Sequence, residues 1–243
     1  MAASVRRLGG WLGRMLGLWL AAAAATAVAA EPAPDRHLAP GFTALEHDAR
    51  IVVVPVDVEL FSISAGGVFE PRADWTAAAQ QHMSAALHER LKALGVLSSN
   101  LDPAVADEHA ELLTLYAAVA RSVDLHHGLG GAWALPTKGG RLDWSFGDAM
   151  KPLQERSGAR YALFTWVRDS YASTERKATA VLMAMIGVAI PLGAQVGYAS
   201  LVDLQTGRLV WFNRLLRGVG DLREAQPAGE SVKLLMTGFP AAR

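Results

Sequence analysis

Hydrophobic and polar residues alternate between residues 50 and 60, and this alternation predicts a β-strand. The apolar positions expected on one face are Val52, Val54, Val56, Val58 and Leu60. Asp57 and Glu59 fall on the other face, near the end of the strand, which suggests that the strand emerges toward solvent. Pro55 cannot donate a ladder hydrogen bond, so one edge is expected to be partly unpaired.

Two later segments carry apolar residues at three- and four-residue steps, which is typical of helices packed on a core. The first is expected to be capped by Asp74 and to end at Gly95. The second begins at Asp102-Pro103, a capping residue followed by proline, and ends at Gly128. A glycine-rich loop, 128–147, and a short helix before Gly158 follow.

The remaining pattern predicts a buried strand over Tyr161–Val167, a hairpin over Gln195–Leu215 and a last helix near Pro227. The order of these elements indicates an α/β fold. We expect a three-layer domain in which helices pack on a mixed β-sheet that includes the C-terminal hairpin.

The first 30 residues have the order of an export signal. Arg6, Arg7 and Arg14 precede an apolar stretch, and small residues at 28–30 offer a cleavage site. An uncleaved membrane anchor is the alternative. Residues 31–49 are then predicted to form a flexible leader, and residues 50–243 a single domain with an apolar insert at 178–194.

Composition and charge narrow the function classes. With 51% hydrophobic and 19% charged residues, the chain is not expected to be disordered. Of its 23 basic residues, three lie in the signal, which leaves 20 against 23 acidic residues and a net charge of −3. That balance argues against a nucleic-acid partner. The sequence contains no cysteine, which excludes disulfide scaffolds, thiol enzymes and attachment of lipid to a cysteine.

Known catalytic and cofactor motifs do not occur, so no cofactor, metal site or catalytic residue is predicted. Gly128–Gly131 resembles a phosphate loop, but Trp133 stands where its third glycine is needed. No serine lies in a G-x-S-x-G motif, and Lys92 replaces the second histidine after His88-Glu89.

Two groups could still carry chemistry. Asp57 and Glu59 share a strand face and could act as paired carboxylates, although a solvated strand end is the simpler interpretation. His126 and His127 are adjacent, so their side chains diverge on a helix, and a role at the helix C-terminus is favoured over metal binding.

The most unusual segment is the uncharged insert from Ala178 to Ala194. It joins two strands, and Gly187 and Pro191 would interrupt a helix that spans a bilayer. We expect it to pack against its own sheet or a neighbouring copy, so that a charge at Met185 would destabilise or dissociate the protein. Contact with a membrane surface and a true spanning segment are the alternatives.

Five large side chains are candidates for contact with a partner. They lie in the glycine-rich loop or in the insert, and are Trp133, Trp144, Met183, Met185 and Ile186. Four other residues are expected to be structural parts of the hairpin, with Asp203 and Thr206 bonding the turn, Gly207 supplying a positive φ and Trp211 packing on the sheet.

The hairpin resembles one found in bacterial envelope proteins. Residues 201–207 read L-V-D-L-Q-T-G and are followed by Val210-Trp211. Similar motifs are V-V-V-P at Val52–Pro55 and the stretch Gly158–Leu163. This pattern is similar to a superfamily that includes the curli-secretion channel (CsgG-type) proteins, the activators of penicillin-binding proteins and related lipoproteins. The resemblance implies an α/β fold and an envelope role, with no catalytic residue.

The sequence therefore favours a non-catalytic periplasmic or envelope protein that acts by protein–protein interaction in envelope assembly or secretion. Its expected partners are other envelope proteins, with a homo-oligomer and a membrane surface also considered. The alternatives are a membrane-associated oligomer related to secretion channels, and a metal- or small-molecule-dependent enzyme that uses Asp57, Glu59 and some of the histidines.

Export can be tested on the chain directly. We expect cleavage near Ala30, because the charged, apolar and small-residue regions follow one another in the order of a signal peptide. N-terminal sequencing of protein purified from the envelope should begin at or near Glu31, and a mature chain that begins at Met1 would contradict the prediction.

Overall fold

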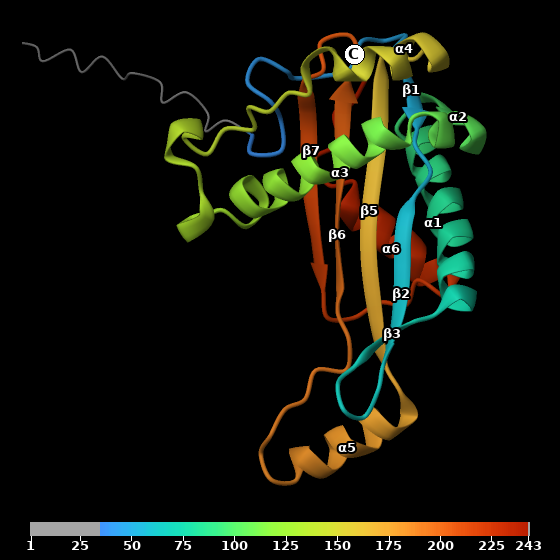
Figure 1. Cartoon of the computed structure of the whole chain (residues 1–243), viewed down its shortest axis with the longest axis vertical. Coiled ribbons are helices and arrows are strands. Elements are labelled where there is room, and N and C mark those ends of the chain that lie inside the picture. The colour runs from blue at the N-terminus through green and yellow to red at the C-terminus, as the bar shows by residue number, and fades with distance from the viewer. Residues whose placement is uncertain (1–34, 243) are drawn as a thin grey trace, which may run out of the picture. The chain divides into compact units, whose positions relative to one another are not determined.

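The computed structural model describes residues 35–242, and its central element is the long strand β5 (Tyr161–Ala172). On one side, β1 (Arg50–Val53) and β2 (Asp57–Ile63) pair in parallel with successive halves of β5. On the other side, β6 (Gln195–Asp203) runs antiparallel to β5 over nine paired residues. Both edges of β5 are therefore covered along most of its length (Figure 1).

Three further strands complete a seven-stranded sheet. β7 (Leu209–Arg217) lies beyond β6 and runs antiparallel to it. At the opposite edge, β4 (Leu97–Asn100) lies parallel to β1, and β3 (Phe69–Pro71) lies antiparallel to β2. The predicted mixed sheet with a C-terminal hairpin is confirmed, whereas β3 and β4 are short strands that the sequence pattern did not indicate.

Helices cover both faces of the sheet. α1 (Ala73–Ala93) and α6 (Ala225–Leu235) contribute to one hydrophobic core, which includes Leu163 of β5. α3 (Ala110–Val123) and α4 (Lys151–Ser157) contribute to a second core on the other face. In Figure 1, α3 crosses in front of the sheet. The predicted three-layer arrangement is confirmed.

The first predicted strand is broken by a bulge. Between the pairs Val53↔Leu163 and Asp57↔Trp166, β1 and β2 are separated by three residues, but only two residues intervene on β5. The extra residue reverses the side-chain alternation. The prediction of one continuous apolar face was therefore wrong: Val52 and Val54 belong to the α3-side core, whereas Val56, Val58 and Leu60 belong to the α1-side core.

The helix boundaries also differ from the pattern. Arg72, not Asp74, is the residue before α1, and Asp74 lies in the first turn as its ion-pair partner. The long second helix is divided at His109, whose backbone leaves the helical region and whose ring donates from Nδ1 to the Val105 carbonyl. α2 (Pro103–Glu108) therefore ends before α3 begins.

The described part of the predicted leader is docked on the sheet, which corrects the expectation of flexibility. Leu38 forms a bridge with Trp211, and the Ala39 amide donates to the Val210 carbonyl. Leu45 is buried in the α1-side core. The Pro- and Ala-rich composition of the leader suggested a linker, but a few large apolar residues, such as Leu38 and Leu45, suffice to anchor it. Residues 31–34 and the predicted signal lie outside the described residues.

A substitution of Trp211 tests the assignment of the hairpin. Its side chain is fully buried and packs edge-on against Phe239. Trp211→Ala should lower the free energy of unfolding by about 3–5 kcal/mol, because truncating a buried tryptophan leaves a large cavity. Trp133, at 61% exposure, provides the control, and Trp133→Ala should change the urea midpoint little. Equal midpoints for both variants would contradict the assignment.

Candidate functional site

The insert forms a projection beyond one end of the sheet. After Ala172 the chain leaves β5 and forms α5 (Thr174–Ala184), and it rejoins the sheet at Gln195 in β6. The helix starts where the Ser173 hydroxyl accepts a hydrogen bond from the Arg176 amide. Figure 1 shows α5 and the loop after it at the lower end of the molecule, away from the other helices.

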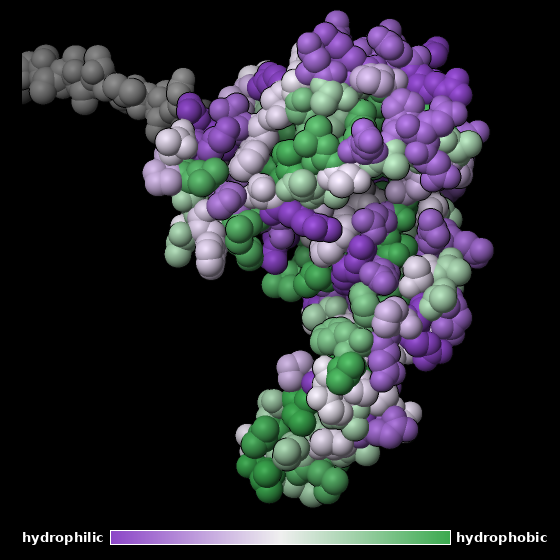
Figure 2. All heavy atoms as spheres, viewed as in Figure 1, coloured by the Kyte–Doolittle hydropathy of each residue, from purple (hydrophilic) through white to green (hydrophobic). Residues whose placement is uncertain are grey.

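The side chains of this projection point into solvent. Residues 181–189 are all exposed, and α5 has no buried residue. Leu182 is 66% exposed, Met185 77% and Ile186 71%. We call residues 181–192 the apolar tip, which is the hydrophobic lower end of Figure 2. The expectation that the insert packs on its own sheet was wrong, because the loop carries these residues past the last strand pair.

Hydrogen bonds join the base of the apolar tip to the sheet. The Ala172 amide donates to the Leu192 carbonyl over 2.7 Å, and the Ser170 amide donates to the Ala194 carbonyl over 3.2 Å. Gly193 makes this approach possible, because a Cβ atom there would lie 2.0 Å from the Ser170 carbonyl oxygen. Arg176 Nε also donates to the Pro191 carbonyl, which joins the two limbs of the insert.

Other exposed apolar side chains lie at this end of the sheet. Val68 ends the connection between β2 and β3, and Phe69 begins β3, where Ile63 pairs with both Phe69 and Ala172. Leu216 and Val219 lie at the end of β7, where Arg217 pairs with Gln195. No sequence period groups these four residues, because they come together only through strand pairing.

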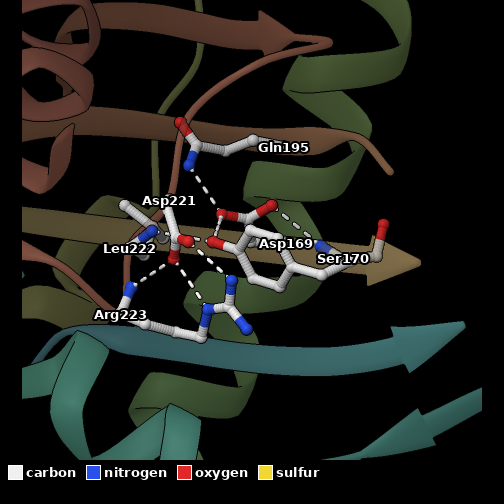
Figure 3. A network of polar contacts seen from close by, with 7 residues as sticks. Asp169, Ser170, Gln195, Asp221, Leu222 and Arg223 are labelled. Atoms are coloured by element: carbon white, nitrogen blue, oxygen red, sulfur yellow. Dashed lines mark hydrogen bonds and ion pairs between the residues drawn. The ribbon is translucent and has the colours of Figure 1, made fainter. Parts of the chain in front are cut away.

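Beneath the apolar tip, a buried polar network fixes the last pair of β5 and β6 (Figure 3). Asp169 is 2% exposed. Its carboxylate accepts from the Ser170 amide and Gln195 Nε2, each over 2.8 Å, and from the Tyr171 hydroxyl. The Tyr171 oxygen in turn accepts from the Leu222 amide. The network thus connects the two strands that carry the insert with the loop before α6.

A neighbouring ion pair braces the same network. Arg223 forms a two-pronged pair with Asp221, and its guanidinium stacks 4.1 Å from the Tyr171 ring centroid and 4.6 Å from that of Trp75. Bonding to Arg223 lowers the pKa of Asp221. Burial raises the pKa of Asp169, although its three donors oppose the shift. No local pattern indicated this cluster, because its polar members lie far apart in the chain, from Asp169 to Arg223.

The predicted paired carboxylates are held by an arginine. Arg168 Nη1 lies 2.7 Å from Asp57 Oδ1, and its Nε lies 3.3 Å from Glu59 Oε2. The guanidinium also lies over the Trp166 ring, 4.8 Å from its centroid. The two carboxylates therefore share one cation. The strand end, which the sequence predicts to be solvated, carries this ion pair.

The histidines serve separate connections. His126 donates from Nδ1 to the Trp133 carbonyl, and His127 donates from Nε2 to the Arg36 carbonyl, each over 2.7 Å. Both lie in the last turn of η1 (Asp124–Leu129), the π-helical segment that continues α3, as the sequence places them, and each ring also bonds a carbonyl outside that helix. Burial lowers the pKa of His127. Within residues 35–242, no group of three His, Asp or Glu residues is placed to hold a metal.

The two candidate tryptophans lie away from the insert. Trp144 accepts through its carbonyl from the Leu209 amide, at the start of β7 and therefore at the end of the sheet opposite the apolar tip. Its ring lies on the α3-side core, and Trp133 is exposed in the same loop. Of the five predicted contact residues, the structure groups only Met183, Met185 and Ile186.

The four hairpin residues shape the β6–β7 turn. Asp203 accepts from the Gln205 amide over 2.9 Å, and Thr206 accepts from the Arg208 amide over 3.3 Å. Gly207 has a φ of 68° and passes so close to Gly147 that a Cβ atom would lie 2.0 Å from its carbonyl oxygen. These roles are structural, as in the sequence-based interpretation.

A small cavity of about 220 Å³ lies beside β7, near the start of the described chain. Its lining includes Arg36, His127 and Arg214, but neither Asp57 nor Glu59. Arg214 donates from Nε to Asp124 over 2.9 Å, so its charge is compensated. The predicted carboxylates and this cavity therefore do not form one site.

Among residues 35–242, every helix is too short or too polar to cross a bilayer. α5 itself has 11 residues.

No family model and no curated protein matches the chain. Among solved structures it is similar to the PelC dodecamer from Paraburkholderia phytofirmans, with 14% identity, a TM-score of 0.41, and 82% of this chain and 93% of that chain covered. It is also similar to the LpoB C-terminal domain from Salmonella enterica, with 14% identity, a TM-score of 0.31, and 74% of this chain and 87% of that chain covered. A third similar structure is the lipoprotein GNA1162 from Neisseria meningitidis, with 15% identity, a TM-score of 0.28, and 70% of this chain and 79% of that chain covered. The resemblance to curli-secretion channels stays a prediction.

The buried network predicts a pH effect on stability. Because the pKa of Asp169 is raised in the fold, this group stabilises the protein fully below the ordinary carboxyl pKa of 3.8, and the contribution is lost as the pH rises through the raised value. Asp169→Asn should remove that decline. Urea unfolding of both proteins across this range measures the difference.

Asp221 provides the matched control. Its pKa is lowered, so its contribution is present above 3.8 and is lost as the pH falls through the lowered value. Asp221→Asn should therefore change the pH dependence only in acid, below the window of Asp169. Parallel profiles for wild type and Asp169→Asn would contradict the role assigned to Asp169.

Proposed function

We propose that this chain is a non-catalytic protein of the bacterial envelope that works by attaching to another envelope component through the apolar tip. One observation carries the proposal: nine consecutive uncharged residues, 181–189, are exposed at the end of a well-braced sheet. Exposed apolar patches of this kind mark sites of contact with proteins, ligands or membranes.

The energetics support attachment. Each large aliphatic side chain contributes roughly 1.5–3 kcal/mol when it is removed from water. Leu182, Met185 and Ile186 obtain little of this within the described chain, because each is more than half exposed. A covering partner would therefore gain several such contributions at once.

The envelope setting rests on the export-signal pattern and the hairpin motif. The enzyme alternative is less well supported, because Arg168 already binds Asp57 and Glu59, and neither carboxylate lines the basic cavity. A projecting segment of exposed apolar residues fits attachment better than turnover.

Photocrosslinking in intact cells tests the proposal. We replace Ile186 in the full chain by p-benzoylphenylalanine and expect adducts on irradiation, because the tip should be covered. Leu97 is the control, since it is 56% exposed but pairs with Arg50 at the opposite end of the sheet. Adducts at neither position, or equally at both, would contradict attachment through the tip.

A further inference from the structure

The last turn of α5 is apolar in every direction. Residues 181–184 are consecutive, uncharged and exposed, and successive helix positions point about 100° apart, so together they surround the helix axis. A helix that is hydrophobic all round belongs in an apolar medium. We infer that the apolar tip inserts into the surface of a lipid bilayer; this inference rests on the proposed function, because it names the component to which the tip attaches.

The helix end within the apolar tip keeps its backbone amides bonded internally. The Ile186 amide donates to the Met183 carbonyl, the Gly187 amide to the Ala184 carbonyl and the Val188 amide to the Met183 carbonyl. Gly187 adopts a φ of 79°, which allows this closed helix end. In hydrocarbon, polar backbone groups need such internal partners. The amides of residues 186–188 have them.

The geometry suits a flat surface. Figure 1 shows α5 lying across the end of the sheet, not along the strands. The exposed side chains of Phe69 and Leu216 lie at this same end, on β3 and β7. A planar surface that meets the tip first would approach these residues next. Interfacial helices lie in this way, with their apolar side about 5–10 Å into the boundary of headgroups and acyl chains.

The charges are placed as a bilayer requires. From Ala178 to Ala194 the insert has no ionisable side chain, and Arg176 and Lys177 immediately precede it. These cations lie where lipid phosphates would be when the tip is immersed. Glu175 in the first turn of α5 and Glu70 of β3 offset them. Apolar contact, not electrostatic attraction, is therefore expected to dominate.

A second copy of the chain fits the tip less well. A standard protein interface uses about 20–30 residues a side, whereas the uninterrupted exposed stretch has nine, residues 181–189. Two tips in contact would also cover only one side of each, leaving the other side of α5 in water. Lipid covers all sides of a projection at once.

The lack of cysteine allows a direct measurement. The chain is purified after export with Ile186→Cys, and the environment-sensitive dye NBD is attached to this cysteine. Vesicles of phosphatidylethanolamine and phosphatidylglycerol should shift its emission to shorter wavelength and raise it severalfold, and nitroxide-labelled lipids should quench it. The same dye on Leu97→Cys should show neither change.

A variant and a change of lipid and salt distinguish apolar contact from electrostatic attraction as the cause of vesicle binding. Met185→Asp in the labelled chain should lower vesicle affinity by about tenfold or more, because a large apolar contact is lost and a charge must be immersed. Since the Met185 side chain is exposed, the melting temperature of the Met185→Asp variant should equal that of the wild type. The wild-type response should persist in neutral phosphatidylcholine vesicles and in high salt.

The outcomes separate the two proposals. Photoadducts with protein at position 186, but no dye response to vesicles, would overturn bilayer insertion and leave the proposed function standing. A dye response that vanishes in neutral vesicles or high salt would also overturn insertion, because it would indicate surface adsorption by charge. The absence of both adducts and dye response would contradict both proposals.

Discussion

The double-sided pairing of β5 is the constraint on which the rest of the structure depends. Its first half pairs with β1 and its second half with β2, while β6 follows its other edge from Tyr161 to Asp169. This register places the two cores on opposite faces and brings Asp169 beside Gln195. Because those two residues form the last pair, the insert must leave and rejoin the sheet at one place.

Much of the fold follows from local pattern, and the errors have identifiable causes. α1, α6 and the hairpin were predicted because their apolar residues recur at a regular spacing, whereas α5 was not predicted. The first strand was misjudged at Pro55, because a bulge shifts the alternation by one residue and an alternating run does not reveal it. The leader was predicted to be flexible because its local composition does not reveal its partners. Leu38 pairs with Trp211 of β7, and Leu45 pairs with Ala242 near the C-terminus.

The candidate site was only partly predictable. An uncharged run of seventeen residues stands out in any sequence, so Met183, Met185 and Ile186 were named together as candidate contact residues, and the structure places them in one exposed segment. The exposure of this segment was not predicted, because an insert that packs on the sheet and one that projects into solvent can have the same composition. The buried network could not be found at all, since Asp169, Gln195 and Leu222 meet only after β5, β6 and the later loop have assembled.

The way the insert joins the sheet makes it separable from the rest of the molecule. β5 and β6 are antiparallel, and the segment between Ala172 and Gln195 begins and ends at neighbouring points. A short reverse turn could join the same two strands without altering their register. Evolution can therefore lengthen, shorten or exchange this segment as a unit, so that chains with one shared sheet come to act in different places.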